Sequence, residues 1–175
     1  MAKRRSRRQP TKEEIQQICE GVGRVIISFA LCEHALTMTL KKLLKLTILQ
    51  ERALVRSMSL KQKTSLMRRL ARDFLSSTEY KTVNDILKDV EKHAESRNDL
   101  AHGFYGHKDA VPAVLTFSGD AKLSARPAPW TPKMLGNLAF EIQAVRFRVE
   151  NCTMLFSLPL KLPKMRPPKP EFGAK

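Results

Sequence analysis

An arginine and a histidine stand close together near the middle of the chain, in the heptapeptide Arg97–Gly103, which reads RNDLAHG. Cleavage of RNA without a metal needs a cation that binds the phosphate and an imidazole that moves a proton, and Arg97 and His102 supply these two groups. Histidine titrates near neutrality, as a general acid or base must. The heptapeptide is therefore the segment of this sequence best equipped for chemistry.

The heptapeptide ends a predicted helix that runs from about Ser77 or Thr78 to Ala101, with Gly103 placed to end it. At about 100° per residue, Arg97 falls within the apolar face of this helix, which also holds Val83, Leu87, Val90 and Ala94. Because a buried cation is costly unless an anion meets it, we expect Arg97 to point toward another helix or a second subunit. Glu33 is the candidate partner, either as a structural salt bridge or as a support that orients Arg97 for substrate.

Asn98 and His102 are four residues apart and share one side of the predicted helix. Arg97 and His102 are five apart, which separates them by about 140° on an ideal helix. Two arrangements would bring them to one phosphate: unwinding of the helix at Gly103, or a dimer whose subunits share a cleft. The helix C-terminus also favours the protonated form of His102.

The pattern of the whole chain predicts an all-α fold, a bundle of four or five helices with a short β-hairpin before the last helix. The first helix covers about Ile15–Leu43, and Gly21 and Gly23 within it would mark a kink or a break. A helical stretch over about 51–74, split near 57–59, comes next and is followed by the helix that ends in the heptapeptide. The hairpin strands are predicted at 111–117 and 121–126. Thr131 then caps the last helix, with Pro132 at its first position.

Two basic segments flank the predicted helical domain, which covers residues 13–158. Residues 1–12 hold six basic side chains and no acid, and residues 159–175 hold five basic side chains, one acid and five prolines. We expect both tails to be disordered. With a net charge of +15, the chain is expected to attract RNA through its phosphates. The alternative is that the tails aid solubility or bind another protein.

Cys19, Cys32 and Cys152 form no close pair, which argues against a disulfide framework or a zinc knuckle and fits a reducing cytosol. We expect them to be small hydrophobic residues on helix faces, in a cytoplasmic protein with no metal and no cofactor. No uninterrupted apolar run approaches the roughly 18 residues that span a bilayer, and no secretory signal follows the basic start. Association with a membrane is therefore not expected.

The heptapeptide resembles the signature of the HEPN superfamily, in which an arginine, usually followed by a polar residue such as asparagine, precedes a histidine by four to six residues. The layout over about residues 13–158 is similar too: a long first helix that contains Phe29–Glu33, a middle helix that ends in the motif, and a final helix. The resemblance implies metal-independent RNA cleavage, in many members as toxins or in phage defence. It also implies a homodimer that builds the site from two motifs, where the RNA 2′-hydroxyl attacks the adjacent phosphate and leaves a cyclic phosphate.

The resemblance implies a role for each residue of the motif. His102 would be the general base or acid, and Arg97 would bind the phosphate and stabilise the charge that grows in the transition state. Asn98 would position the histidine or the phosphate. Glu33 and Asp99 would support the site, Glu33 on geometry alone.

One position departs from the family's pattern. Members that are partnered with a nucleotidyltransferase-type antitoxin often have a tyrosine two residues after the histidine, where Phe104 stands here and Tyr105 follows. This departure puts that regulation in doubt and leaves open whether an antitoxin partner exists. Tyr105, like Phe104 and Trp130, would either stack on RNA bases or belong to the core.

Three functions are compatible with this sequence. The first is an endoribonuclease that acts on RNA as a homodimer. The second is a catalytically silent bundle of the same fold that binds RNA or a protein partner. The third is a basic structural or adaptor protein, in which Arg97 and His102 make only polar contacts in the core.

Overall fold

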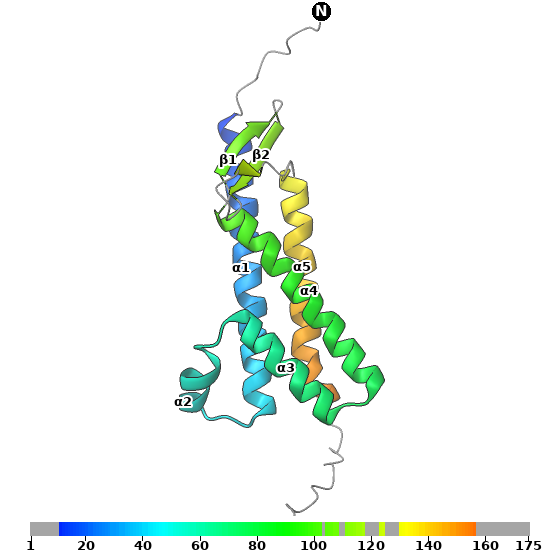
Figure 1. The fold of residues 1–175 in the computed structure, drawn as a ribbon. Coiled ribbons are helices and arrows are strands. Elements are labelled where there is room, and N and C mark those ends of the chain that lie inside the picture. Colours follow the sequence, from blue (N-terminus) through cyan, green and yellow to red (C-terminus); the bar gives the residue numbers. More distant parts are fainter. Residues whose placement is uncertain (1–10, 103, 109–110, 118–122, 125–129, 157–175) are drawn as a thin grey trace, which may run out of the picture.

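The computed structural model describes residues 11–102, 104–108, 111–117, 123–124 and 130–156, so both predicted tails except residues 11 and 12 lie outside the described residues. The fold is all-α, as the apolar pattern predicts, with a small antiparallel sheet (Figure 1). Its elements are α1 (Lys12–Leu43), α2 (Ile48–Gln50), the π-helical turn η1 (Glu51–Val55), α3 (Leu60–Phe74), α4 (Ser77–His102), β1 (Phe104–Lys108), β2 (Val111–Phe117), β3 (Leu123–Ser124) and α5 (Pro132–Leu155).

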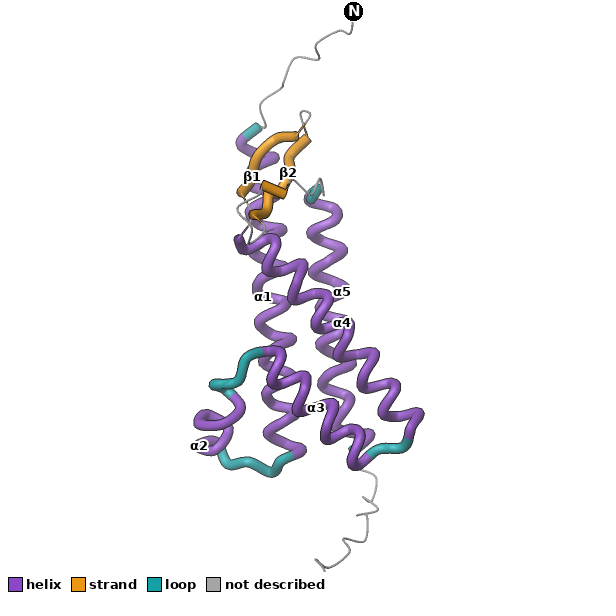
Figure 2. The backbone as a smooth tube through the Cα atoms, viewed as in Figure 1, coloured by secondary structure: helices purple, strands orange, loops and turns teal. Residues whose placement is uncertain are grey.

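α1 and α5 are long helices that lie side by side and run in the same direction (Figure 2). Near the start of both helices, Gly21 lies against the side chain of Leu135. Near their ends, the Thr39 hydroxyl donates a hydrogen bond of 3.3 Å to the carbonyl oxygen of Val149. α4 crosses over this pair, and α3 packs beside the first half of α4 (Figure 1).

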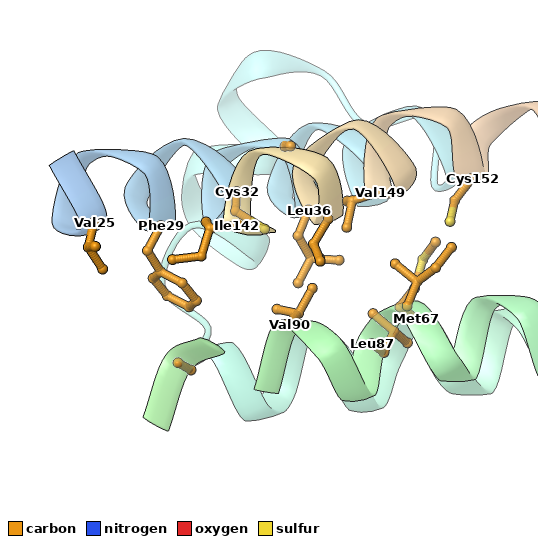
Figure 3. Packing of buried hydrophobic residues seen from close by; sticks show 14 of the residues in the cluster. Val25, Phe29, Cys32, Leu36, Met67, Leu87, Val90, Ile142, Val149 and Cys152 are labelled. Atoms are coloured by element: carbon orange, nitrogen blue, oxygen red, sulfur yellow. The ribbon is translucent and has the colours of Figure 1, made fainter. Parts of the chain in front are cut away.

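The core lies where α1, α3, α4 and α5 meet (Figure 3). The spacing of the apolar residues of the last helix predicts one buried face, and this is confirmed because all seven of them are buried: Leu135, Leu138, Ile142, Val145, Val149, Cys152 and Phe156. Cys32 and Cys152 pack in this core, where burial raises the pKa of each thiol to about 11. Cys19 is exposed.

Local capping sets where the helices start. Thr131 caps α5 by accepting a hydrogen bond from the Met134 amide, as predicted. The predicted break after η1 is confirmed as well, because Ser59 caps a new helix there. α4 begins at Ser77, as predicted, and its cap is Ser76, which exchanges hydrogen bonds with Glu79 three residues later in a capping box.

Gly21 and Gly23 do not interrupt α1, which is continuous over 32 residues. The prediction of a break was wrong because burial against α5 and α4 outweighs the low helix propensity of two glycines. Gly21 has a different role. A Cβ atom at this position would lie 2.8 Å from Leu135 Cδ1 and 2.9 Å from Leu135 Cβ, so α1 and α5 can approach this closely only at glycine.

The sheet differs from the predicted hairpin in its main partner. β2 pairs over five residues with β1, which was not expected to be a strand, and only the two residues of β3 represent the predicted second strand. Two residues of sequence join β1 to β2, whereas five separate β2 from β3, so the first pairing closes the shorter loop. Pro112 of β2 pairs with His107 of β1. At this point β2 has one neighbouring strand among the described residues, so the missing N–H group of the proline is tolerated.

By length and composition alone, α1 contains a stretch that is apolar enough to cross a bilayer. This stretch is not an uninterrupted apolar run, since Arg24 and Glu33 interrupt the apolar residues of α1. The central helix of a helical bundle passes the same test, and α1 supplies Val25, Phe29, Leu36 and Leu40 to the core described here.

The contact between Gly21 and Leu135 predicts opposite effects for two alanine substitutions two residues apart, on different sides of α1. Gly21→Ala forces α1 and α5 apart and should lower the free energy of unfolding by about 1–3 kcal/mol. Gly23→Ala is the matched control, since nothing lies within 4 Å of its Cβ, and it should raise that free energy by up to about 1 kcal/mol. Urea unfolding followed by circular dichroism measures both, and equal effects would contradict the close approach.

Candidate functional site

Arg97 lies on the inner face of α4, as predicted, and the helix it faces is α1. Its guanidinium carbon stands 4.9 Å from the centre of the Phe29 ring, in the range of a cation–π contact. The side chain is half-buried, and its Nε is enclosed with no hydrogen-bond partner among the described residues. An aromatic face attracts a cation but does not neutralise it, so Arg97 retains its capacity to bind an anion.

Glu33, the candidate partner of Arg97, is bound elsewhere. Lys63 of α3 donates a hydrogen bond of 3.0 Å to Glu33 Oε1, and the Lys63 side chain is only 5% exposed. The Lys63 ammonium group is buried and therefore needs the carboxylate. The Arg97 guanidinium is half-exposed and stacks on a ring, so it needs a carboxylate less. Glu33 therefore stabilises the position of α3, and no contact of Glu33 supports a role in orienting Arg97.

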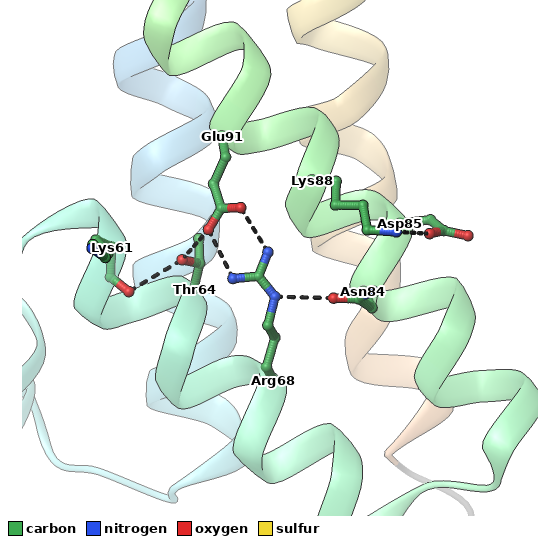
Figure 4. A network of polar contacts seen from close by, with 7 residues as sticks. All are labelled: Lys61, Thr64, Arg68, Asn84, Asp85, Lys88 and Glu91. Carbon is green, nitrogen blue, oxygen red and sulfur yellow. Dashed lines mark hydrogen bonds and ion pairs between the residues drawn. The ribbon is translucent and has the colours of Figure 1, made fainter.

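The second connection of α3 is a half-buried network with α4 (Figure 4). Arg68 binds both carboxylate oxygens of Glu91, at 2.8 Å and 2.7 Å, and donates a third hydrogen bond to Asn84. Thr64 adds a hydrogen bond of 2.7 Å to the same carboxylate. The hydrogen bonds from Arg68 are the main reason that the pKa of Glu91 is lowered, so this carboxylate stays charged and committed to α3.

The other residues of the motif lie at the end of α4. Asn98 and His102 are exposed and Asp99 is half-buried. The helix is regular through His102, so unwinding before this residue does not bring His102 toward Arg97, and the separation of about 140° holds. Within one chain the two side chains therefore point to different sides of α4.

Tyr105 lies in β1, where it pairs with Val114, and the position of its side chain is outside the described residues. The same holds for Phe104 and His107. Among the described residues, no three His, Cys, Asp or Glu side chains come together as metal ligands would. The predicted stacking role of Tyr105 therefore stays a prediction.

One open surface lies between α1 and α4. Glu33 of α1 and Glu91 of α4 both face α3. Seven residues make about two helical turns, so Ile26 of α1 and Asn98 of α4 face the same side as these glutamates, just beyond the first turn of α3. Ile15 and His102, eleven positions from Ile26 and Glu91, continue the two rows. We call this surface the α1–α4 face and define it by Ile15, Val22, Ile26, Asn98 and His102.

Apolar side chains are exposed on the α1–α4 face. Ile15 is 49% exposed and Ile26 is 39% exposed, while Val22 is half-buried. Phe29, with Arg97 stacked above it, borders the same row of α1. The face thus combines exposed apolar side chains of α1 with the Asn98 amide and the His102 imidazole of α4, while Arg97 lies beside it on Phe29.

His93 is a residue that the motif did not include. It precedes Arg97 by four positions on α4, is buried, and lines a cavity between α4 and α5 together with Trp130 and Asn137. In the sequence, the one signal for this cavity is that His93 and Arg97 on α4, and Asn137 and Glu141 on α5, are four residues apart, so each pair lies on one side of its helix. Predicting it requires knowing which two helices meet.

The chain matches no protein-family model, no curated protein and no solved structure. The resemblance to the HEPN superfamily therefore depends on the heptapeptide Arg97–Gly103 and on the order of the helices. Its implications for RNA cleavage enter below as a proposal.

A structural role for Glu33 predicts that Glu33→Gln lowers the free energy of unfolding by about 1–3 kcal/mol, because it leaves Lys63 buried without a carboxylate. Adding Lys63→Met should restore most of the loss, since it removes the buried charge while keeping similar volume. Glu20→Gln, an exposed glutamate of the same helix, is the control. Urea unfolding measures all four proteins, and a stable Glu33→Gln variant would contradict this role.

Proposed function

We propose that this protein is a metal-independent endoribonuclease that cleaves RNA as a homodimer. The observation that carries the proposal is Arg97, a half-buried guanidinium on the Phe29 ring with no anionic partner among the described residues. Nearby carboxylates that would neutralise it, Glu33 and Glu91, are bound to Lys63 and Arg68. An RNA phosphate is the anion that such a group is suited to bind.

The geometry of the motif favours a site shared by two subunits. His102 is exposed and lies about 140° around α4 from Arg97, so one chain does not direct both groups at one phosphate. In a dimer formed through the α1–α4 face, His102 of one chain and Arg97 of the other approach the same strand. The exposed Ile15 and Ile26 supply apolar area for that interface.

The proposed reaction needs one base and one acid. His102 takes the proton from the RNA 2′-hydroxyl, the 2′-oxygen bonds to the adjacent phosphorus, and the bond from phosphorus to the 5′-oxygen breaks. The partner subunit's His102, in its protonated form, gives a proton to the departing 5′-oxygen. Arg97 stabilises the charge that grows on the phosphate. The products are a 2′,3′-cyclic phosphate and a free 5′-hydroxyl.

The chemistry predicts that His102→Ala lowers the rate of RNA cleavage at least about 100-fold, because the proton transfers lose their catalyst. The thermal midpoint should not change, since His102 is exposed. His34→Ala, which removes another exposed histidine, should cleave at the normal rate. The measurement is gel analysis of a labelled RNA with end-group analysis for the cyclic phosphate.

Cleavage that persists in His102→Ala at the normal rate would sink the proposed mechanism. RNA binding without any cleavage by the wild-type chain would instead favour the silent RNA-binding bundle. Arg97→Lys keeps the charge but loses the planar, bidentate group, so it should also reduce cleavage while the protein stays folded.

The shared site predicts different effects for charges at two adjacent isoleucines of α1. Ile26→Lys places a charge on the α1–α4 face and should convert the dimer to monomers and abolish cleavage. Ile27→Lys is the control: Ile27 is 63% exposed but lies about 160° from Phe29 around α1, so it faces away from α4. Sedimentation and cleavage assays on both variants test this, and dissociation by Ile27→Lys alone would place the interface on the opposite face and rule out a shared site.

A further inference from the structure

A cavity of about 300 Å³ lies between α4 and α5, on the other side of α4 from His102. Met134 and Leu138 line it with apolar side chains, and Trp130 lines it with an aromatic one. This volume is at the lower end of the range for small-molecule sites, so it suits a ligand of the size of one ring system. The cavity is not part of the proposed cleavage site.

The polar side chains of the cavity come from both helices. α4 contributes Lys92, His93 and Ser96, and α5 contributes Asn137 and Glu141. They offer a cation, hydroxyl and amide groups, an imidazole and a carboxylate around one small space. Lys92, Asn137 and Glu141 are exposed and form the open rim of the pocket, Ser96 is half-buried, and His93 is the buried polar residue of its lining.

His93 is the buried polar residue of this lining. The residue is 95% buried, and its Nδ1 has no hydrogen-bond partner among the described residues. Burial is the main reason that the pKa of His93 is lowered, against the opposite effect of Glu141 on α5 and Asp89 on α4 and with a smaller contribution from Lys92. The imidazole is therefore neutral at neutral pH, with one N–H group and one lone pair.

The enclosed Nδ1 indicates which ring nitrogen serves a ligand. An unpaired buried N–H group is rarer in proteins than an unpaired acceptor, so Nδ1 is the nitrogen without the proton. Nε2 then carries the hydrogen and is the donor that His93 offers to the cavity. A ligand with an acceptor in its ring plane, such as a carbonyl oxygen or a ring nitrogen, matches that donor.

We propose that the cavity between α4 and α5 binds a single nucleobase, from a free nucleotide or from an RNA strand. Trp130 supplies a flat face on which a base stacks. The Asn137 amide can donate to and accept from a base edge, which is how proteins read bases that are out of a helix. His93 donates to an acceptor of the base, and Lys92 at the exposed rim meets the phosphate.

Trp130 makes the proposal directly testable, because it is the only tryptophan of the chain and lines the cavity. The full-length protein is titrated with each of the four ribonucleoside monophosphates, and its fluorescence is followed after correction for nucleotide absorbance. We expect a saturable change with at least one nucleotide. Ribose 5-phosphate, which has the sugar and phosphate without the base, should produce no such change.

The variant that tests the site is Asn137→Ala, whose side chain is exposed and whose loss should leave the fold intact. It should weaken nucleotide binding about tenfold or more. Asn151→Ala is the matched control, because it removes an exposed asparagine from the same helix outside the cavity. Equal binding by both variants, or an equal response to ribose 5-phosphate, overturns the proposal.

A short RNA oligonucleotide distinguishes the two sources of the base. Titrated into the His102→Ala variant, it should bind about tenfold or more tightly than the mononucleotide if the base belongs to a strand, and equally if the natural ligand is a free nucleotide. No saturable response to either probe overturns the inference. Because these are binding measurements, a nucleotide-binding cavity in a protein that cleaves no RNA would leave this inference standing while the proposed function fails.

Discussion

α1 and α5 lie side by side in parallel, so close at Gly21 that a single added methyl group would collide with Leu135. Two parallel helices cannot be joined by a short turn, and the chain between them must return along their length. α4 makes that return on one side of the pair and crosses both helices, and α3 packs beside its first half (Figure 1). The position of α4, and with it the direction in which Arg97 points, therefore follows from the contact between α1 and α5.

The pairing of charges then decides what Arg97 can do. Lys63 and Arg68 of α3 bind the carboxylates of Glu33 and Glu91, which anchor α3 to α1 and to α4. Arg97 lies beyond the end of α3 and meets an aromatic ring in place of a carboxylate. A cation held in this way is fixed in direction and still able to bind an anion, and this combination supports a phosphate-binding role better than the sequence motif does by itself.

Most of the helices were predictable because their signals are local. The threonine and proline at the start of α5, the break before Ser59 and the inward direction of Arg97 all follow from residues within a few turns of each other. The errors have a different origin. Assigning Glu33 to Arg97 overlooked Lys63, which lies thirty residues from Glu33 in sequence, and the partner of β2 depended on a competition between two loops.

The sequence by itself determined the faces of the helices and the angle between Arg97 and His102, since helical periodicity relates residues only to their near neighbours. Only the tertiary structure decided which faces meet. It placed Phe29 under Arg97, paired Glu33 with Lys63, left Ile15 and Ile26 of the α1–α4 face exposed, and buried His93 near Trp130. The physical reason is that charge pairing and burial depend on distances between segments far apart in the chain, and no local pattern contains those distances.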